Sequence, residues 1–169
     1  KNKQVYETPL VIGLDRRADY NDADRRAQFE AAMRVHGLFG RMTDLTDRIQ
    51  YSRMMAGAIA AQLPEKDRLR TQLSAFADAA EAVRKDIVAT KEGGAITGEE
   101  RLREHTDVLY GAIMGYDGRP TDYQVARIDV LEGELSAIND RYAEVESKHL
   151  GKINEGLRKA GLPEITWPP

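Results

Sequence analysis

The chain has 169 residues, of which 41% are hydrophobic and 31% are charged, and its formal net charge is −3. Acidic and basic residues are interleaved, so nucleic acid is not an expected partner, and no run approaches the ~18 apolar residues of a membrane span. The absence of cysteine excludes disulfides, thiolate metal ligands and cysteine nucleophiles. The length is that of one soluble domain.

Residues 1–20 form a segment with its own composition. The stretch from Val5 to Ile12 is rich in strand-forming residues, and Pro9 restricts any strand to a sheet edge. A lone strand is unstable, so this arm either packs on the outside of the helical part or is the last strand of an upstream β domain. Leu10 and Ile12 are its candidate contact residues. The chain begins with Lys1 and no signal segment follows, which we interpret as a processed product or a piece of a longer protein.

The spacing of apolar residues predicts a first helix over residues 21–63. Asn21 is a suitable N-cap, and acidic residues follow in the first turn. Phe29, Met33 and Phe39 are expected to widen the apolar stripe at its N-terminal end. The stripe steps by three and four residues through Val35, Leu38, Met42, Leu45, Ile49, Ser52, Ala56, Ile59 and Leu63. Three interior glycines, which are unfavourable in a helix, predict close approach of a neighbouring helix at Gly37, Gly40 and Gly57.

Two shorter helices are predicted next. One runs over residues 65–90 after Pro64, with a stripe of Leu69, Leu73, Phe76, Ala80, Val83 and Ile87. The other follows a turn at residues 91–94. Its expected capping box is Thr97 with Glu100, and it ends near Met114.

The last helix is predicted over residues 121–160. Thr121 and Gln124 have the spacing of a capping box, and Gly161 followed by Pro163 is a C-terminal stop signal. Gly151 predicts a bend near Leu150, and Gly156 strengthens that expectation. The stripe comprises Ile128, Leu131, Leu135, Ile138, Tyr142, Val145 and His149.

These elements predict an all-α fold. Short connections favour an antiparallel, up-down-up-down four-helix bundle with long first and last helices, preceded by the arm (residues 1–20) and closed by an extended tail (bundle and tail, residues 21–169). Because the helix lengths are unequal, we expect a two-helix extension at one end or a bent long helix.

Few residues suggest chemistry. Glu146 and His149 have the Glu-x-x-His spacing of carboxylate-bridged di-iron bundles, but such a site needs a second copy of the motif and two further glutamates. His36 and His105 have Met33 and Leu102 three residues before them. We therefore assign no catalytic residue and no cofactor, and keep Glu146 and His149 only as weak metal candidates.

The tail holds the only tryptophan. Trp167 is expected to fold back with Ile165 onto the bundle or the arm, because burying one aromatic residue locally needs no partner. The alternative is that both residues anchor a neighbouring domain. They are the candidate interaction residues of the tail.

Two stretches resemble a known family. The segment from Glu7 to Arg17, running into Gln28-Phe29, is similar to "pl-x-V-x-x-D-P-R … l-x-x-q-f", although Arg16 stands where proline is usual. The segment from Ile153 to Ile165 is similar to "L-N-x-x-L-x-x-x-G-L-P-x-I". Both patterns resemble the C-terminal region of exported bacterial proteins with sortilin-type, BNR-repeat (Asp-box) β-propellers, which are often labelled glycosyl hydrolases.

This resemblance implies that the arm is a remnant of an upstream β domain, that the parent is extracytoplasmic, and that any glycosidase-like site lies on the missing propeller. The first functional hypothesis is therefore a non-catalytic accessory domain that contacts its parent chain or a protein partner, through an apolar patch near the arm or Trp167. The second is a free-standing helical adaptor that oligomerises, and the third is a metal-dependent bundle enzyme using Glu146 and His149.

Overall fold

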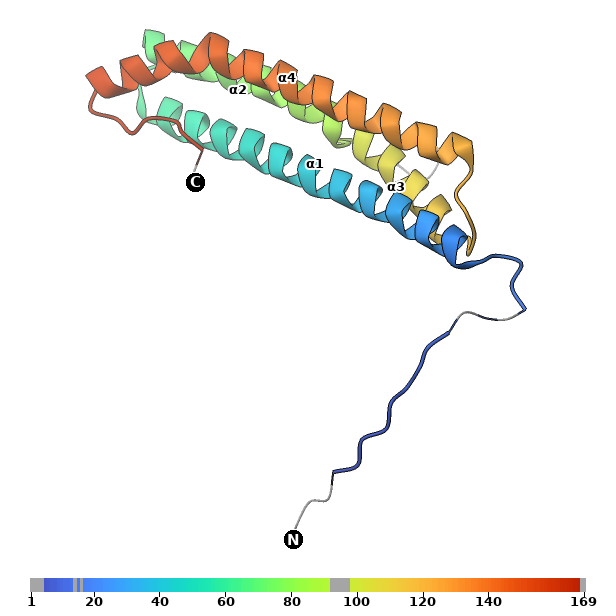
Figure 1. Ribbon diagram of the computed structural model, residues 1–169. Coiled ribbons are helices and arrows are strands. Elements are labelled where there is room, and N and C mark those ends of the chain that lie inside the picture. Colours follow the sequence, from blue (N-terminus) through green and yellow to red (C-terminus); the bar gives the residue numbers. More distant parts are fainter. Residues whose placement is uncertain (1–4, 14, 16, 92–97, 168–169) are drawn as a thin grey trace.

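The computed structural model describes residues 5–13, 15, 17–91 and 98–167. Within these residues it contains four α-helices and no strand: α1 (Asp22–Gln62), α2 (Arg68–Ile87), α3 (Leu102–Met114) and α4 (Asp122–Lys159). The all-helical bundle with long first and last helices is therefore confirmed. Figure 1 shows the helices packed together, with the N-terminal arm leaving from the start of α1.

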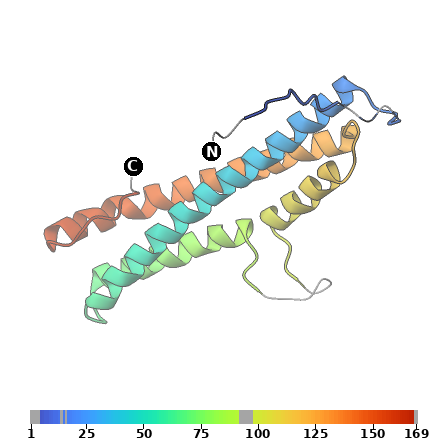
Figure 2. The same cartoon turned by 90° about the horizontal axis from the view of Figure 1, so that it is seen from below.

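The helix directions do not alternate along the chain as the up-down-up-down prediction expected. Ion pairs join Arg34 to Glu132 and Arg48 to Glu146, so α1 and α4 are parallel. Leu69 lies against Gly156, whereas Asp86 pairs with Arg141, so α2 is antiparallel to α4. Figure 2 shows α3 following α2 in the same direction along the same side of α1.

The bundle thus has three helical columns, one of them built from α2 and α3 end to end. Helix length explains this arrangement. At ~1.5 Å per residue, α1 with 41 residues is about 60 Å long, whereas α2 with 20 and α3 with 13 are about 30 and 20 Å. Neither short helix alone covers the long apolar stripes of α1 and α4. Placed one after the other along the same side, the two short helices do. The long connection over residues 88–101 allows the chain to continue without reversing.

Two predicted N-terminal caps are confirmed. The Asn21 side chain accepts hydrogen bonds from the backbone N–H groups of Ala23 and Asp24. Thr121 Oγ1 accepts from the N–H of Gln124 at 3.2 Å, and the Gln124 side chain accepts from the N–H of Thr121 at 2.9 Å. Each pair satisfies N–H groups that the first helical turn leaves without partners.

The starts of α2 and α3 differ from prediction. α2 begins at Arg68 rather than residue 65, because the Asp67 carboxylate caps the N–H of Leu69 at 2.7 Å. α3 begins at Leu102, where the buried stripe starts, and Glu104 rather than Glu100 accepts from the N–H of the N-cap residue. Thr97 lies outside the described residues.

The end of α4 follows the predicted stop signal. Gly161 has a φ of 68°, in the left-handed region that favours glycine. Its N–H donates to the carbonyl of Arg158, and the N–H of Leu162 donates to that of Leu157, which is the Schellman arrangement. α4 is helical without interruption to Lys159, and Figure 1 shows its axis changing direction within the last third.

Most residues of the predicted stripes are buried, although Leu63, Val145 and His149 are only partly buried. At the start of α1, Phe29 and Met33 were expected to widen the stripe and are exposed, whereas Phe39 packs partly buried against the core as expected. Gln28 is buried instead, and its Nε2 donates to the carbonyl of Ile113 at 2.9 Å and to that of Tyr116. Since those carbonyls at the end of α3 would otherwise lack partners, a polar side chain is favoured here.

The predicted close approach at Gly37, Gly40 and Gly57 is wrong within the described chain. A Cβ atom on any of the three would meet no atom within 4 Å, because all three lie on the exposed face of α1. A close approach occurs instead at Gly156, where a Cβ would lie 3.0 Å from Leu69 Cδ1. The sequence alone does not distinguish these two environments, because glycine leaves no side chain in the apolar pattern.

This difference predicts that an alanine substitution changes the stability of the protein differently at Gly40 and at Gly156. Gly40→Ala is expected to raise the free energy of unfolding by about 0.5–1 kcal/mol, because alanine loses less backbone entropy in a helix. Gly156→Ala is expected to raise the free energy of unfolding by less than this, or to lower it, since Leu69 must move. Urea unfolding of both variants tests this, and equal shifts of the midpoint in the two variants would contradict it.

Candidate functional site

A groove lies between α1 and α4. Its volume is about 630 Å³, and it is lined by Arg41, Asp44, Leu45, Arg48, Glu132, Leu135, Ser136, Asn139 and Trp167. The two leucines are almost fully buried and form its apolar floor. The other residues give it polar and charged walls, so the groove has the mixed lining of a binding site.

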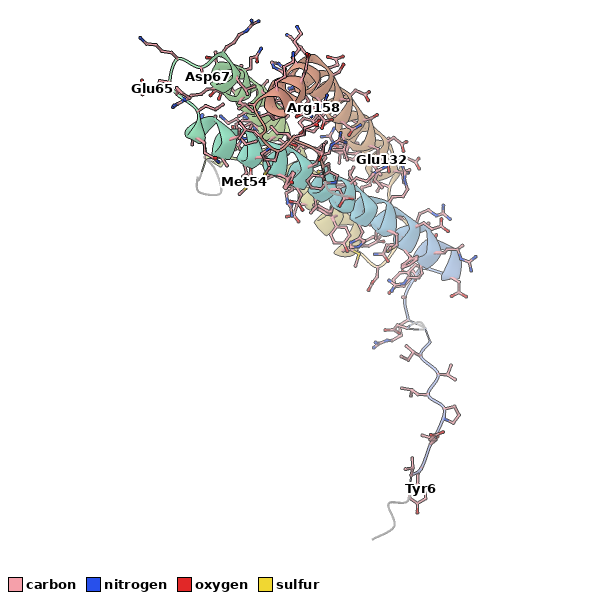
Figure 3. All side chains as sticks on the ribbon, turned by 90° about the vertical axis from the view of Figure 1, so that its left-hand side faces the viewer. Tyr6, Met54, Glu65, Asp67, Glu132 and Arg158 are labelled. Atoms are coloured by element: carbon pink, nitrogen blue, oxygen red, sulfur yellow. The ribbon has the colours of Figure 1, made fainter. Side chains whose placement is uncertain are left out.

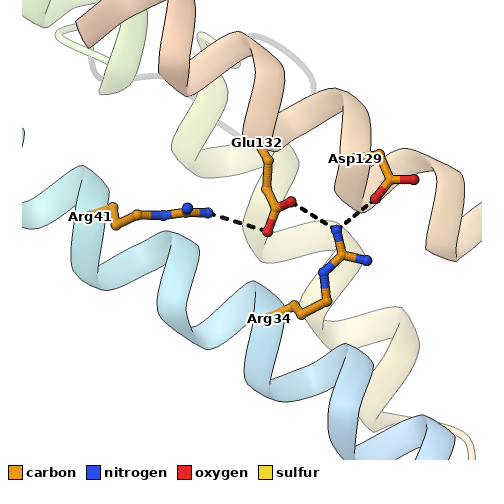
Figure 4. Close-up of polar contacts among 4 residues, drawn as sticks. All are labelled: Arg34, Arg41, Asp129 and Glu132. Carbon is orange, nitrogen blue, oxygen red and sulfur yellow. Dashed lines mark hydrogen bonds and ion pairs between the residues drawn. The ribbon is translucent and has the colours of Figure 1, made fainter.

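Arginines on α1 form ion pairs with acidic residues on α4 at the groove and beside it, and of these residues Arg41 and Glu132 line the groove. Arg34 contacts Asp129 at 2.6 Å and Glu132 at 2.8 Å, and Arg41 contacts Glu132 at 3.3 Å (Figure 4). The hydrogen bond from Arg34 to Glu132, followed by that to Asp129, raises the pKa of the Arg34 guanidinium. Ion pairs this exposed contribute about 0–1 kcal/mol each. Their main effect is therefore on how α1 and α4 are placed relative to each other, and their contribution to the free energy of unfolding is small.

Further along α1, Arg48 spans the same pair of helices. Its Nε donates to Glu146 Oε1 at 3.2 Å and its other nitrogen bonds to Oε2. The guanidinium lies 5.5 Å from the centroid of the Tyr142 ring, which is buried, and this burial raises the pKa of Tyr142. Glu146, one of the two metal candidates, is therefore held in an ion pair.

The second metal candidate faces a different helix. The His149 ring packs against Phe76 of α2, with 6.2 Å between ring centroids. Among the residues the structure describes, no group of three or more histidine, cysteine, aspartate or glutamate side chains could hold a metal ion. The structure brings no third ligand to Glu146 and His149, so it adds no support to the metal hypothesis.

The tail docks on the bundle through Ile165. The Asn154 side chain forms two hydrogen bonds with the Ile165 backbone, accepting from its N–H at 2.9 Å and donating to its carbonyl at 3.0 Å. Ile165 is 1% exposed. Trp167 packs edge-on against Tyr51 of α1 with ring centroids 5.4 Å apart, and it remains 46% exposed at the edge of the groove. Both tail candidates thus lie on the bundle, as the folding-back interpretation expects.

The part of the arm over residues 5–13 is exposed. Leu10, Val11 and Ile12 are more than 80% exposed, and residues 5–13 have no regular secondary structure. Figure 3 shows Tyr6 in the arm at one end of the molecule, with Asp67 and Arg158 at the opposite end. Of the two roles expected for the arm, packing on the outside of the bundle is therefore not observed for residues 5–13.

A second, shallower hollow of about 390 Å³ lies where α2, α3 and α4 meet, and it includes His105, Asp86 and Arg141. Beside it, Glu99 joins the two ends of the long connection. Its carboxylate accepts from the N–H of Thr90 at 3.0 Å and pairs with Arg101. The Thr90 N–H, followed by the Arg101 guanidinium, lowers the pKa of Glu99 to about 2.

This shift predicts a specific acid titration. Because the folded pKa of Glu99 lies below the unfolded value, its contribution to stability is complete above about pH 4.5 and is lost as the pH falls towards 2. In Arg101→Gln the pKa should rise yet stay below 4.5, since the Thr90 N–H remains. An NMR titration of the Glu99 side chain measures both values, and an ordinary midpoint in the wild-type chain would contradict the prediction.

The groove was not predicted from the sequence, although the spacing of charged and polar residues on the two long helices indicates it. Arg34, Arg41 and Arg48 are spaced by seven residues, as are Glu132, Asn139 and Glu146. Heptad spacing places each set along one edge of its helix. Asn154 had no comparable signal, because an asparagine inside a helix is usually solvated.

The comparisons with known proteins add no assignment: no protein-family model, curated protein or solved structure matches this chain. Within the described residues, none of the four helices combines the length and hydropathy that crossing a membrane requires.

Proposed function

We propose that this chain is a non-catalytic helical accessory domain that serves protein contacts, carried at the C-terminus of a larger exported bacterial protein with a BNR-repeat, glycosyl-hydrolase-like β-propeller. Any glycosidase-like chemistry would then belong to the propeller. The parent and its extracytoplasmic location rest on the resemblance of the two terminal stretches.

One structural observation supports a contact role above the others. Consecutive aliphatic residues of the arm, Leu10 to Ile12, are exposed to water next to a well-packed helical bundle. Three adjacent exposed aliphatic side chains are unfavourable in a soluble chain unless another surface covers them. An upstream β domain of the same parent would cover them by pairing with the arm as an edge strand.

The size and location of the native protein test this proposal. An antibody raised against residues 21–167 would be used on the cytoplasmic, periplasmic and secreted fractions of the source cells. We expect a species several times larger than 18.9 kDa outside the cytoplasm. A species of about 18.9 kDa would overturn the accessory-domain proposal in favour of a free-standing adaptor.

A further inference from the structure

The ion pairs between α1 and α4 form a ladder with one rung missing. Arg34 bonds to Glu132 and Arg48 bonds to Glu146, and each pair is separated by 98 residues. The same separation places Arg41 opposite Asn139. An amide therefore stands where the ladder would have an acid, and Arg41 reaches back to Glu132, which Arg34 already binds.

The groove lies at this missing rung. Arg41 and Asn139 both line it, above the apolar floor of Leu45 and Leu135. Asn139 makes no hydrogen bond within the described part of the chain, and the Arg41 side chain is 57% exposed. The site thus offers the exposed Arg41 guanidinium, the Asn139 amide with its donor and acceptor atoms, and an apolar surface, and its lining also includes Arg48, Asp44 and Glu132.

The chain's own tail provides a comparison, because similar groups elsewhere on α4 hold it against the bundle. Glu164 pairs with Arg158 at 3.0 Å, Ile165 is buried, and Asn154 holds the Ile165 backbone through two hydrogen bonds. An arginine and an asparagine thereby hold an extended Glu-Ile dipeptide on the bundle. The tail then reaches the groove directly, because Trp167 forms part of its lining.

We propose that the groove between α1 and α4 binds an extended peptide segment of a partner protein, with an acidic side chain next to an aliphatic one. The acid takes the missing rung and pairs with Arg41. The aliphatic side chain covers Leu45 and Leu135, and the backbone bonds to Asn139 as the tail does to Asn154. This inference deepens the proposed function, on which it rests, by naming the contact surface and the chemistry of the partner.

The single tryptophan provides the measurement. Trp167 lies at the edge of the groove, so its fluorescence should respond when a peptide binds. The probe is a synthetic peptide with the sequence of residues 162–167 carrying Trp167→Phe. Because this peptide has no tryptophan, the tryptophan fluorescence comes from the protein alone. We expect a saturable emission change with the full 169-residue chain, and at least tenfold weaker binding for the same peptide carrying Glu164→Gln.

Variants then locate the binding site. Asn139→Glu supplies the missing rung from within the chain, and Arg41→Gln removes its basic partner. Each should weaken peptide binding at least tenfold. Ser74→Glu, a change at an exposed position of α2 that adds the same charge as Asn139→Glu, should leave binding unchanged. Arg158→Gln, which removes only the exposed ion pair between α4 and Glu164 of the tail, should also leave binding unchanged, and this separates groove binding from exchange with the tail.

Several results would overturn the inference. These are no saturable change up to the solubility limit of the peptide, equal binding by Asn139→Glu and the wild-type chain, or loss of binding in Arg158→Gln alone. A concentration-dependent mass of the free protein that Asn139→Glu abolishes would assign the groove to a second copy instead. A parent-sized species in cells with no peptide binding would overturn this inference alone, whereas an 18.9 kDa species with peptide binding would overturn only the propeller parent.

Discussion

Replacing Phe76 by alanine is expected to lower the free energy of unfolding by about 3–5 kcal/mol, the range for removing a buried aromatic side chain. Phe76 is 0% exposed and lies on α2, which packs against both α1 and α4. Its removal leaves a cavity in the middle of the three-column core. The short α2 helix cannot shift to fill it without losing its own contacts.

The matched control is Phe29→Ala on α1, which removes the same side chain from a site that is 64% exposed. It should change the free energy of unfolding by about 0.5 kcal/mol or less. Urea unfolding followed by circular dichroism, with equal m values, compares the two variants. Similar losses in both would contradict the placement of the core.

Replacing Ile165 by alanine should release the tail. Removing a buried isoleucine side chain costs about 2–5 kcal/mol, but we expect the loss here to be limited to the docking energy of the tail, because Ile165 lies after the end of the last helix. Asn154 then loses the backbone groups that it holds, and Trp167 leaves Tyr51. We expect the Trp167 emission to shift towards that of the unfolded chain while the helical content is retained.

Ile12→Ala provides the control, because Ile12 is also an isoleucine in a terminal segment but is 88% exposed. It should leave both the Trp167 emission and the unfolding midpoint unchanged in the 169-residue chain. An unshifted Trp167 emission in Ile165→Ala would show that the tail is held by groups other than Ile165.

The two predictions concern residues that the sequence treats differently. Phe76 belongs to a stripe with regular steps of three and four, so its burial could be predicted from the helical period alone. Ile165 lies in a non-helical tail without periodicity, and only its hydrophobicity and the neighbouring Trp167 suggested that it folds back. Its partner Asn154 could not be predicted, since the contact joins residues 11 positions apart across a helix end.

Sequence by itself determined the helices, most of their buried faces and several of their ends. These depend on local interactions: the 3.6-residue period places apolar residues on one face, and caps satisfy N–H and C=O groups within a few residues. The Asn21 and Thr121 caps and the Gly161 stop are of this kind.

Only the tertiary structure decided the helix directions and the groove. The apolar stripes of α2 and α3 would bury equally well in either direction, so the choice depends on how two short helices together cover two long ones. The groove depends on the register between α1 and α4, which brings Arg41 opposite Asn139 although 98 positions separate them. Local period carries no information about such a register, because it is selected by the sum of contacts along the whole interface.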